Sequence, residues 1–223
     1  LEQQCGLMQG MFSKMGFHIT PKLDKADIVV FGGGSDVNPI LYGEDPLPGT
    51  IYNDERDAWC MNLWRNSEDK LKIGICRGGQ FLNVMNGGKL WQHVDQHGRS
   101  HQLKDEFTGE KWHVSSTHHQ MFRPARDAIV VATARETTFK QAYTTNWKLK
   151  NDNTPVDNFM KKDIEVLYYP GTMSLCFQPH PEYITPPSTK TYFGDVYHRM
   201  VKGVLEEQEA ERKAKIAKVA VNI

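Results

Sequence analysis

Residues 72–80 read KIGICRGGQ, and this stretch decides the fold. A short apolar run ends in Cys76, which has a glycine two positions away on either side, and a helical apolar pattern follows at once. A strand that turns sharply into a helix lifts the side chain at the turn out of the sheet, and a Cβ at position 74 or 78 would crowd the bend. The N-terminus of the helix then points its unpaired N–H groups at the sulfur and favours the thiolate. The stretch predicts a nucleophilic cysteine on a strand-to-helix elbow.

A candidate base follows a second apolar run. Residues 174–178 read SLCFQ, which indicates a buried strand, and residues 179–183 read PHPEY. His180 lies between two prolines that stiffen its backbone, and Glu182 can reach back to one ring nitrogen. The other ring nitrogen is then available to take the proton of Cys76, as a nucleophile–base–orienter triad requires. A lone cysteine is more often a core residue, so the prediction of a Cys76–His180–Glu182 triad rests on both segments together.

Four segments in sequence order resemble the class I glutamine amidotransferase superfamily. They read FGGGSDVNPILYGE at 31–44, GICRGGQ at 74–80, VSSTHHQ at 114–120 and QPHPE at 178–182. The Cys-Arg-Gly variant is most similar to the γ-glutamyl hydrolase branch, the peptidase C26 type that includes γ-glutamyl-γ-aminobutyrate hydrolase. The resemblance implies an α/β fold with a doubly wound, mostly parallel sheet flanked by helices. It also implies a hydrolase that cleaves γ-glutamyl amide bonds through a thioester.

The same bond chemistry serves two functions, and the sequence leaves both open. A stand-alone hydrolase would act on a small γ-glutamyl substrate, whereas a glutaminase subunit would deliver ammonia to a separate synthetase. The sequence has no synthetase domain and no ATP-binding glycine loop, so an amidotransferase would need a synthetase partner; a homodimer is also open. The Cys-Arg-Gly and Tyr-Gly-Glu features favour stand-alone hydrolysis. A non-catalytic regulatory relative is disfavoured because Cys76, His180 and Glu182 occur together.

The glycine loop at 32–34 has two interpretations. It is either a tight turn after the predicted strand 27–31, or one side of an oxyanion hole. In the second case a backbone N–H of Gly33 or Gly34, with Gly33 preferred, acts together with the N–H of Arg77 on the tetrahedral adduct. Glycine matters there because a side chain would block close approach of the backbone. Whether the Arg77 side chain pairs with a carboxylate or with substrate is left open.

The resemblance also implies residues that hold the α-amino and α-carboxylate end of the substrate. Gln80, one helical turn after Cys76, is the first of them. The segment at 114–120 would add backbone and hydroxyl contacts, although relatives commonly carry asparagine at position 115, which leaves that contact in doubt. The residues implied in this segment are Ser115, Ser116, Thr117 and His118.

Two groups of histidines suggest metal ligands, but we expect neither a metal nor a cofactor. His93, His97 and His101 recur within a segment that we interpret as an extended hairpin, where such side chains are more often solvent-facing. No cysteine pattern accompanies them. The adjacent His118 and His119, even with His113, are not enough for a metal site, and their place in a segment that resembles the superfamily makes packing around a pocket the better explanation.

Composition narrows the function classes. Lys plus Arg and Asp plus Glu number 27 each, so no charge excess marks a nucleic-acid or anionic-membrane surface. No apolar run approaches bilayer length. The four cysteines show no disulfide or metal spacing, which favours a thiol enzyme in a reducing cytoplasm.

The remaining pattern predicts one catalytic domain over 1–203 and a charged helical tail over 204–223. The tail carries Ile216, Val219 and Val221 as a small apolar surface. We expect helices at 1–15 and 54–66, the second with Trp59, Cys60 and Leu63 inward, and further strands at 128–132 and 164–169. The superfamily begins with a strand before its first helix, and this sequence begins inside that helix. We therefore expect a missing N-terminal strand, with Leu1 beside its position.

Overall fold

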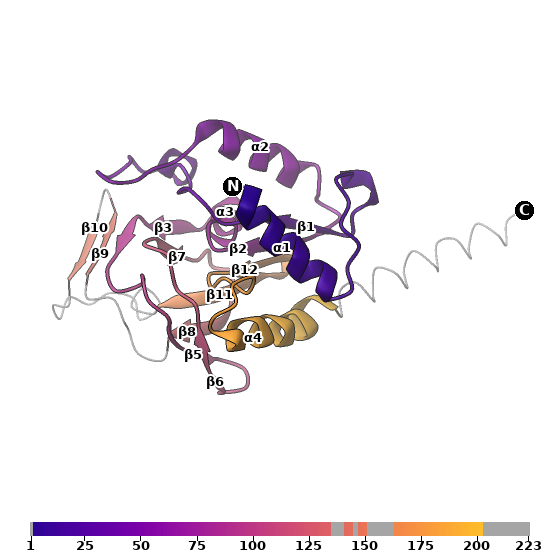
Figure 1. Cartoon of the computed structure of the whole chain (residues 1–223). Helices are drawn as coiled ribbons and strands as arrows, with labels where there is room; N and C mark the ends of the chain where they lie inside the picture. Colours follow the sequence, from indigo (N-terminus) through magenta and orange to yellow (C-terminus); the bar gives the residue numbers. More distant parts are fainter. Residues whose placement is uncertain (1, 135–140, 145–146, 151–162, 203–223) are drawn as a thin grey trace, which may run out of the picture.

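The computed structural model describes residues 2–134, 141–144, 147–150 and 163–202, and its centre is a seven-stranded sheet (Figure 1). Successive apolar side chains of the strands point to opposite faces, so both faces need a helical cover. The strands, in their order across the sheet, are β1 (Ile28–Phe31), β2 (Leu71–Ile75), β12 (Ser174–Phe177), β11 (Ile164–Tyr169), β8 (Ile129–Ala134), β5 (His101–Asp105) and β6 (Lys111–Val114).

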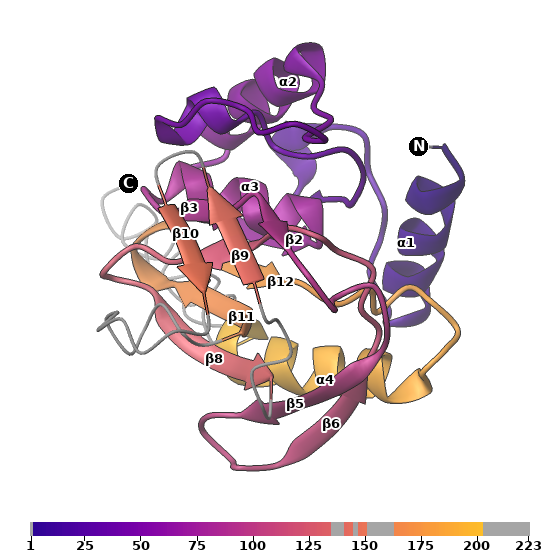
Figure 2. The ribbon, with the colours of Figure 1, turned by 90° about the vertical axis from the view of Figure 1, so that its left-hand side faces the viewer.

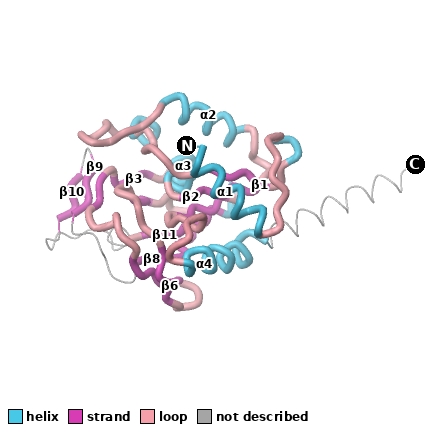
Figure 3. The backbone as a smooth tube through the Cα atoms, viewed as in Figure 1, coloured by secondary structure: helices cyan, strands magenta, loops and turns pink. Residues whose placement is uncertain are grey.

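Helices cover both faces of this sheet, which confirms the predicted α/β class (Figures 1 and 3). On one face, α1 (Glu2–Lys14) and α4 (Pro187–Tyr197) pack their apolar side chains on alternate residues of β2, such as Ile73 and Ile75. On the other face, α2 (Asp54–Arg65) and α3 (Arg77–Met85) pack with Phe31 of β1 and Cys176 of β12. Four short helices complete the helical elements of the described residues: η1 (Leu23–Lys25), η2 (Pro39–Tyr42), η4 (Pro170–Thr172) and η5 (His198–Lys202).

The strands of the sheet run in mixed directions. β1, β2 and β12 pair in parallel, whereas the neighbours from β12 to β6 pair antiparallel. The sheet is thus more mixed than the alternation of strands and helices predicts. For the β11–β12 pair the cause is local, because the connection is the three-residue η4, and a parallel pair needs a crossover of a dozen or more residues. The three parallel strands end at the same edge, which is where ligands bind in open α/β sheets.

Two small sheets lie beside the main one, and neither is evident from the sequence pattern. β3 (Lys89–Trp91) pairs with β7 (Met121–Arg123), while β9 (Gln141–Thr144) lies between β4 (His93–Val94) and β10 (Trp147–Lys150). Figure 2 shows β9 and β10 facing the viewer in front of the main sheet. Their strands are two to four residues long, too short for a clear alternating pattern.

Most predicted elements are found within two residues of their expected bounds, but the predicted orientation of one side chain is wrong. Trp59 is 63% exposed, so the expectation that it faces inward is wrong, whereas Cys60 is buried. The two residues are adjacent in α2, and successive helical residues point about 100° apart. A single narrow apolar stripe therefore accommodates only one of them.

The described residues do not test the predictions made for the two ends of the chain. β1 is the outermost strand on its side of the sheet in the described residues, and a strand preceding Leu1 stays a prediction. The tail at 204–223, with Ile216, Val219 and Val221, lies outside the described residues, so the division at residue 203 also stays a prediction. In the portion of the chain that the structure describes, none of the helices has the length and apolar character needed to cross a bilayer.

Candidate active site

Cys76 sits at the tight junction between β2 and α3. Its backbone has φ 51° and ψ −114°, a conformation that non-glycine residues rarely adopt. A Cβ added to Gly74 would overlap the backbone of Gly78, and one added to Gly78 would overlap the carbonyl of Phe31. The predicted crowding at positions 74 and 78 is therefore confirmed. The strained turn aims the sulfur away from the sheet at the edge where the parallel strands end.

His180 reaches the same edge because β12 is the parallel neighbour of β2. The amide of Cys76 donates to the carbonyl of Phe177, the last residue of β12, at 2.8 Å. His180 follows three residues later, and its ring lies near enough to Cys76 for the sulfur to influence the pKa of the ring. Its Nδ1 lies 2.7 Å from Oε1 of Glu182, which leaves Nε2 for the sulfur. The structure thus brings the three residues of the predicted triad together.

Two further contacts hold His180 in place, one to its backbone and one to its ring. The backbone N–H of His180 donates to Oγ of Ser115 at 2.8 Å, and the Ser115 hydroxyl donates to the His180 carbonyl at 3.2 Å. The ring of Tyr183 stacks on the imidazole with centroids 4.4 Å apart. Both contacts restrict the ring to the plane in which one nitrogen faces Glu182 and the other faces Cys76.

The charge state of His180 follows from these contacts. Burial opposes a charged ring, but the hydrogen bonds to Cys76 and Glu182, together with their negative charges, raise the pKa of His180 to about 10. An imidazolium beside the sulfur in turn favours a thiolate. The arrangement therefore suits a nucleophilic ion pair at neutral pH.

The glycine loop approaches both reactive side chains. A Cβ on Gly33 would lie 2.9 Å from Cε1 of His180 and 3.6 Å from Cβ of Cys76, so only glycine fits there. Arg56 of α2 donates to the carbonyls of Gly32 at 3.0 Å and Gly33 at 2.7 Å. These two hydrogen bonds fix the position of the glycine loop relative to the sulfur of Cys76.

The Arg77 side chain pairs with protein rather than reaching into the site. Its guanidinium forms a buried ion pair with Asp57 and donates to Sγ of Cys60 at 3.3 Å, both on α2. This answers the question that the sequence left open in favour of the carboxylate. Arg56 and Asp57 were not predicted as part of the site; a doublet of opposite charges within a helix gives no local signal of what each one contacts.

The residues implied for substrate binding lie close to the triad, but several already have protein partners. Nε2 of Gln80 donates to the carbonyl of Gln120 at 3.2 Å and to Oε1 of Gln178 at 3.1 Å. The Ser116 hydroxyl donates to the carbonyl of His97. Ser115, Ser116 and His118 are buried, whereas Thr117 is exposed.

The expectation that the histidines at 97 and 101 face solvent is wrong. His97 is fully surrounded by protein, and the His101 side chain is 9% exposed. Both rings turn toward Glu165 of β11, and His118 reaches the same carboxylate from another loop. His93 and His119 remain outside this group; their Nδ1 atoms lie 3.2 Å apart. The burial arises because Glu165, 64 positions after His101, comes from a central strand that no hairpin pattern could reveal.

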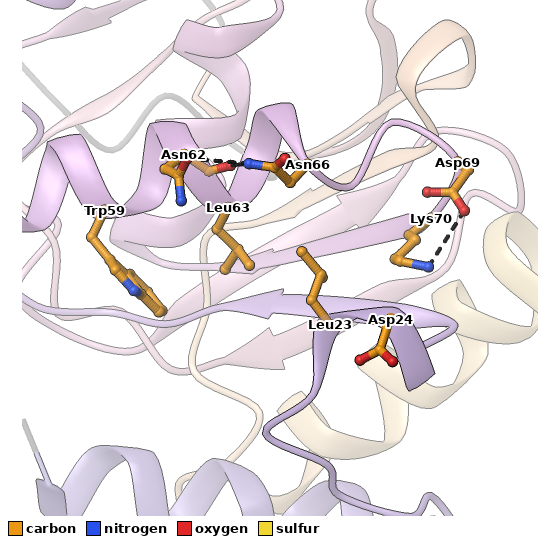
Figure 4. A pocket seen from close by; sticks show the side chains of 8 residues that line it. All are labelled: Leu23, Asp24, Trp59, Asn62, Leu63, Asn66, Asp69 and Lys70. Carbon is orange, nitrogen blue, oxygen red and sulfur yellow. Dashed lines mark hydrogen bonds and ion pairs between the residues drawn. The ribbon is translucent and has the colours of Figure 1, made fainter.

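A separate hollow lies at the opposite end of the parallel strands (Figure 4). It is lined by residues of η1, of α2 and of the turn before β2, including Leu23, Trp59 and Lys70. Because η1 and Lys70 precede β1 and β2, this hollow is at the amino ends of the strands, while Cys76 is at the carboxyl ends. It takes no part in the candidate site.

Comparison with a solved structure defines the class of protein. The fold matches a crystal structure described as "a putative gmp synthase subunit a protein" from Thermoplasma acidophilum with a TM-score of 0.60 at 15% identity, covering 92% of this chain and 90% of the other. At that identity the match shows the fold. The molecule thus shares the α/β fold of that protein.

Sequence comparison then gives the family. The sequence model of the family Peptidase C26 matches residues 12–148, more than half of the chain, and the chain belongs to that family. It is 33% identical over 132 residues to "Putative glutamine amidotransferase Rv2859c" of Mycobacterium tuberculosis, covering 49% of this chain and 43% of that one. It is also 33% identical over 124 residues to "Putative glutamine amidotransferase-like protein YvdE" of Lactococcus lactis, covering 45% and 52%. The chain therefore spans about half the length of these curated relatives.

Proposed function

We propose that this chain is a cysteine-dependent hydrolase that cleaves γ-glutamyl amide bonds through a γ-glutamyl thioester. One observation carries the proposal: a strained elbow presents Cys76 to an imidazole whose other nitrogen is 2.7 Å from a carboxylate. Such an array can hold a nucleophile, a proton carrier and an orienting group in contact. Membership of the Peptidase C26 family and the amidotransferase names of its relatives support a glutamine-like acyl group.

In the first half of the reaction, the Cys76 thiolate attacks the γ-carbonyl carbon and forms a C–S bond. The carbonyl electron pair moves to oxygen, which becomes an oxyanion. As the adduct collapses, the C–N bond breaks, and the His180 imidazolium gives its Nε2 proton to the departing nitrogen. Free amine or ammonia leaves, and the glutamyl group remains on sulfur as a thioester.

In the second half, a water molecule replaces the amine. Neutral His180 takes a proton from this water through Nε2, and the oxygen attacks the thioester carbonyl carbon. Collapse of the second adduct breaks the C–S bond, which releases glutamate and restores the thiolate–imidazolium pair. Glu182 stays ionised throughout; it fixes the ring orientation and stabilises the imidazolium each time it forms.

We assign the oxyanion hole to the backbone N–H groups of Gly33 and Arg77. Gly33 is supported over Gly34 because it borders both Cys76 and His180, whereas a Cβ on Gly34 would overlap Arg56. Arg77 directly follows the nucleophile at the start of α3, where N–H groups have no partner within the helix. Preorganised donors of this kind contribute about 3–4 kcal/mol to transition-state stabilisation.

We propose that Gln80 and the segment 115–118, which together form one wall of the site, bind the α-amino and α-carboxylate end of the substrate. Some of these residues contact the substrate, and others hold the contacting residues in place. The exposed Thr117 is the best placed to contact substrate with its hydroxyl, while Ser115 acts through the His180 backbone that it holds. Gln80 and His118 share the carbonyl of Gln120 and keep the wall in place.

The test measures ammonia and glutamate release from L-glutamine against amine release from a panel of γ-glutamyl amides. Cys76→Ser is the blank, and its activity should be at least about 10³-fold lower. His113→Gln, which changes an exposed histidine, is the matched control for His180→Gln. Turnover of γ-glutamyl amides with poor glutaminase activity supports the stand-alone hydrolase. If the variants at 76 and 180 match the parent, the triad does not act as proposed.

A second candidate function is favoured by the names of the relatives. Both relatives described above are named as glutamine amidotransferases or as similar to one. In that case the chain is a glutaminase subunit that passes ammonia to a synthetase. Turnover of glutamine alone, at a low rate that rises on addition of a synthetase partner, would support this function over the first.

A further inference from the structure

Four side chains from three separated parts of the chain lie together; three are histidines, and they converge on the fourth, a carboxylate. They are His97 in the loop after β4, His101 at the start of β5, His118 in the loop between β6 and β7, and Glu165 on β11. His97 is 1% exposed, His118 5% and Glu165 0%. We call these four residues the histidine cluster.

The spacing of the cluster fits ligands around a single ion. Oε1 of Glu165 lies 3.5 Å from Nδ1 of His97 and 3.7 Å from Nε2 of His118. One ligand atom from each of these three residues lies within 4.8 Å of the others. Tetrahedral bonds of about 2.0–2.2 Å separate neighbouring ligand atoms by roughly 3.4 Å. The contacts to the carboxylate are therefore close to metal-site values.

Two members of the cluster, Glu165 and His118, have buried inner atoms without a well-aligned hydrogen bond among the described residues. Both carboxylate oxygens of Glu165 and Nε2 of His118 are among them, and the nearest ring nitrogen to the carboxylate is Nε2 of His101 at 3.0 Å. Buried polar groups in folded proteins are almost always paired, and a buried carboxylate with only poorly aligned contacts is costly. A cation among these atoms would satisfy them together.

The outer ring nitrogens are held in the way that metal-binding histidines require. Nδ1 of His118 lies 2.8 Å from the carbonyl of Gln120, which can only accept a hydrogen bond, so Nδ1 is the protonated nitrogen that donates it. In the neutral ring, Nε2 then directs a lone pair toward Glu165, which is the orientation that a shared cation requires. Nε2 of His97 lies 3.3 Å from Oδ2 of Asp163, and its Nδ1 faces Glu165. A carbonyl or carboxylate behind each ligating imidazole is the usual outer partner.

From this geometry we propose that His97, His118 and Glu165 bind a divalent transition-metal ion, with zinc the preferred ion. Two imidazoles and a carboxylate suit zinc, whereas calcium and magnesium take oxygen ligands almost entirely. His101, whose Nε2 lies 3.0 Å from the same Glu165 oxygen, is the nearest side chain for the fourth position. Asp163 is a positioning residue that orients His97.

The site is structural and supports the candidate active site. The Glu165 carbonyl accepts the amide of Gln178 at 2.9 Å, two residues before His180. The Gln120 carbonyl that holds His118 also accepts Nε2 of Gln80, one turn after Cys76. A metal here would join β11 to the loops at 95–101 and 115–120 and so fix the wall behind the triad. No step of the hydrolysis passes through it.

The test is the metal content and zinc response of the whole chain. The Cys76→Ser protein, purified without a histidine tag, removes the reactive thiol as a competing ligand. We expect about one zinc per chain by elemental analysis, and a chelator-stripped sample that regains one equivalent of zinc or cobalt(II). Cobalt should give the visible absorption of a tetrahedral nitrogen and oxygen site. A parent that holds less than about a tenth of an equivalent, and regains none, overturns the proposal.

Variants in the same background separate ligands from surface histidines. His118→Gln and Glu165→Gln should lower the zinc affinity by more than about 100-fold, and Asp163→Asn by about 10–100-fold. His113→Gln, an exposed control, should leave it unchanged. Addition of zinc should raise the melting temperature of the stripped parent and of the control but not of the ligand variants, with circular dichroism reporting their folding. An equal loss in the control, or full binding by Glu165→Gln, would contradict the proposal.

Discussion

The triad and the histidine cluster use the same residue types in opposite ways. At the triad, each nitrogen of His180 has its own partner, Glu182 on one side and Cys76 on the other. In the cluster, the rings of His97, His101 and His118 all turn toward one carboxylate, Glu165. One-to-one pairing positions a proton, whereas convergence of several lone pairs positions a cation. The number of partners per ring nitrogen, and not the count of histidines, distinguishes the two sites.

The largest expected effect comes from breaking the pairing at the triad. Glu182→Gln keeps the shape but removes the charge that orients and stabilises the His180 imidazolium. We expect kcat/KM for the preferred γ-glutamyl substrate to fall by about 10³–10⁴-fold, with KM little changed. Steady-state kinetics check this, with Glu110→Gln, an exposed glutamate, as the control. An effect of less than tenfold would mean that Glu182 is not the orienting group.

The next effect is on stability, at the turn that presents the nucleophile. Gly78→Ala places a Cβ against the backbone carbonyl of Phe31, and a backbone group cannot move aside as a flexible side chain can. We expect a loss of about 3 kcal/mol or more in the free energy of unfolding, measured by urea denaturation. Gly194→Ala, in the helix α4 with nothing within 4 Å, is the control and should be neutral or slightly stabilising. Equal stability of the two variants would show that the elbow is not tightly packed.

A smaller effect tests the charge of His180 directly. The anionic reagent iodoacetate is attracted by an imidazolium, whereas neutral iodoacetamide is not. Because the pKa of His180 is raised to about 10, the ring stays charged through neutral pH and loses its proton only as the pH rises through that value. The rate of Cys76 alkylation by iodoacetate, relative to iodoacetamide, should stay level up to about pH 9 and then fall. His180→Gln should lower the ratio by about tenfold and remove its pH dependence, while a level ratio in the parent beyond pH 11 would refute the assignment.

The smallest effect concerns the support of the base. Ser115→Ala removes two hydrogen bonds to the His180 backbone and leaves a buried N–H without its acceptor. We expect a loss of about 1–3 kcal/mol in stability and a lower kcat with an unchanged KM for substrate. The control is Ser100→Ala, an exposed serine in the loop before β5. A rise in KM without a change in kcat would instead assign Ser115 to substrate binding.

The features that could be predicted from the sequence are those encoded in short contiguous segments. Gly74, Cys76 and Gly78 specify the elbow by their spacing alone, and His180 with Glu182 specifies an oriented base. Both signals are local, because the glycines act within one turn and the carboxylate reaches back two residues. The strand at 164–169 and its hairpin partner were likewise predictable from an apolar run on each side of Pro-Gly.

The features that could not be predicted depend on contacts between remote segments. Glu165 looks like a polar residue on a strand, and only the sheet order shows that it faces His97 and His118. Arg56 and Asp57 are adjacent in sequence, yet one holds the glycine loop and the other holds Arg77. The orientation of Trp59 was predicted wrongly because helical spacing alone does not say how wide the buried face of the helix is. In each case the missing information is tertiary packing and not local propensity.

The parallel pairing of β2 with β12 also determines when the sulfur becomes reactive during folding. The nucleophile and its base are at positions 76 and 180, so the strands that carry them meet only after a long loop has closed. Until that contact forms, the chain carries an ordinary thiol with an ordinary reactivity. Fast alkylation of Cys76 therefore marks the completed sheet, and its recovery after dilution from denaturant times the slow, non-local part of the folding reaction.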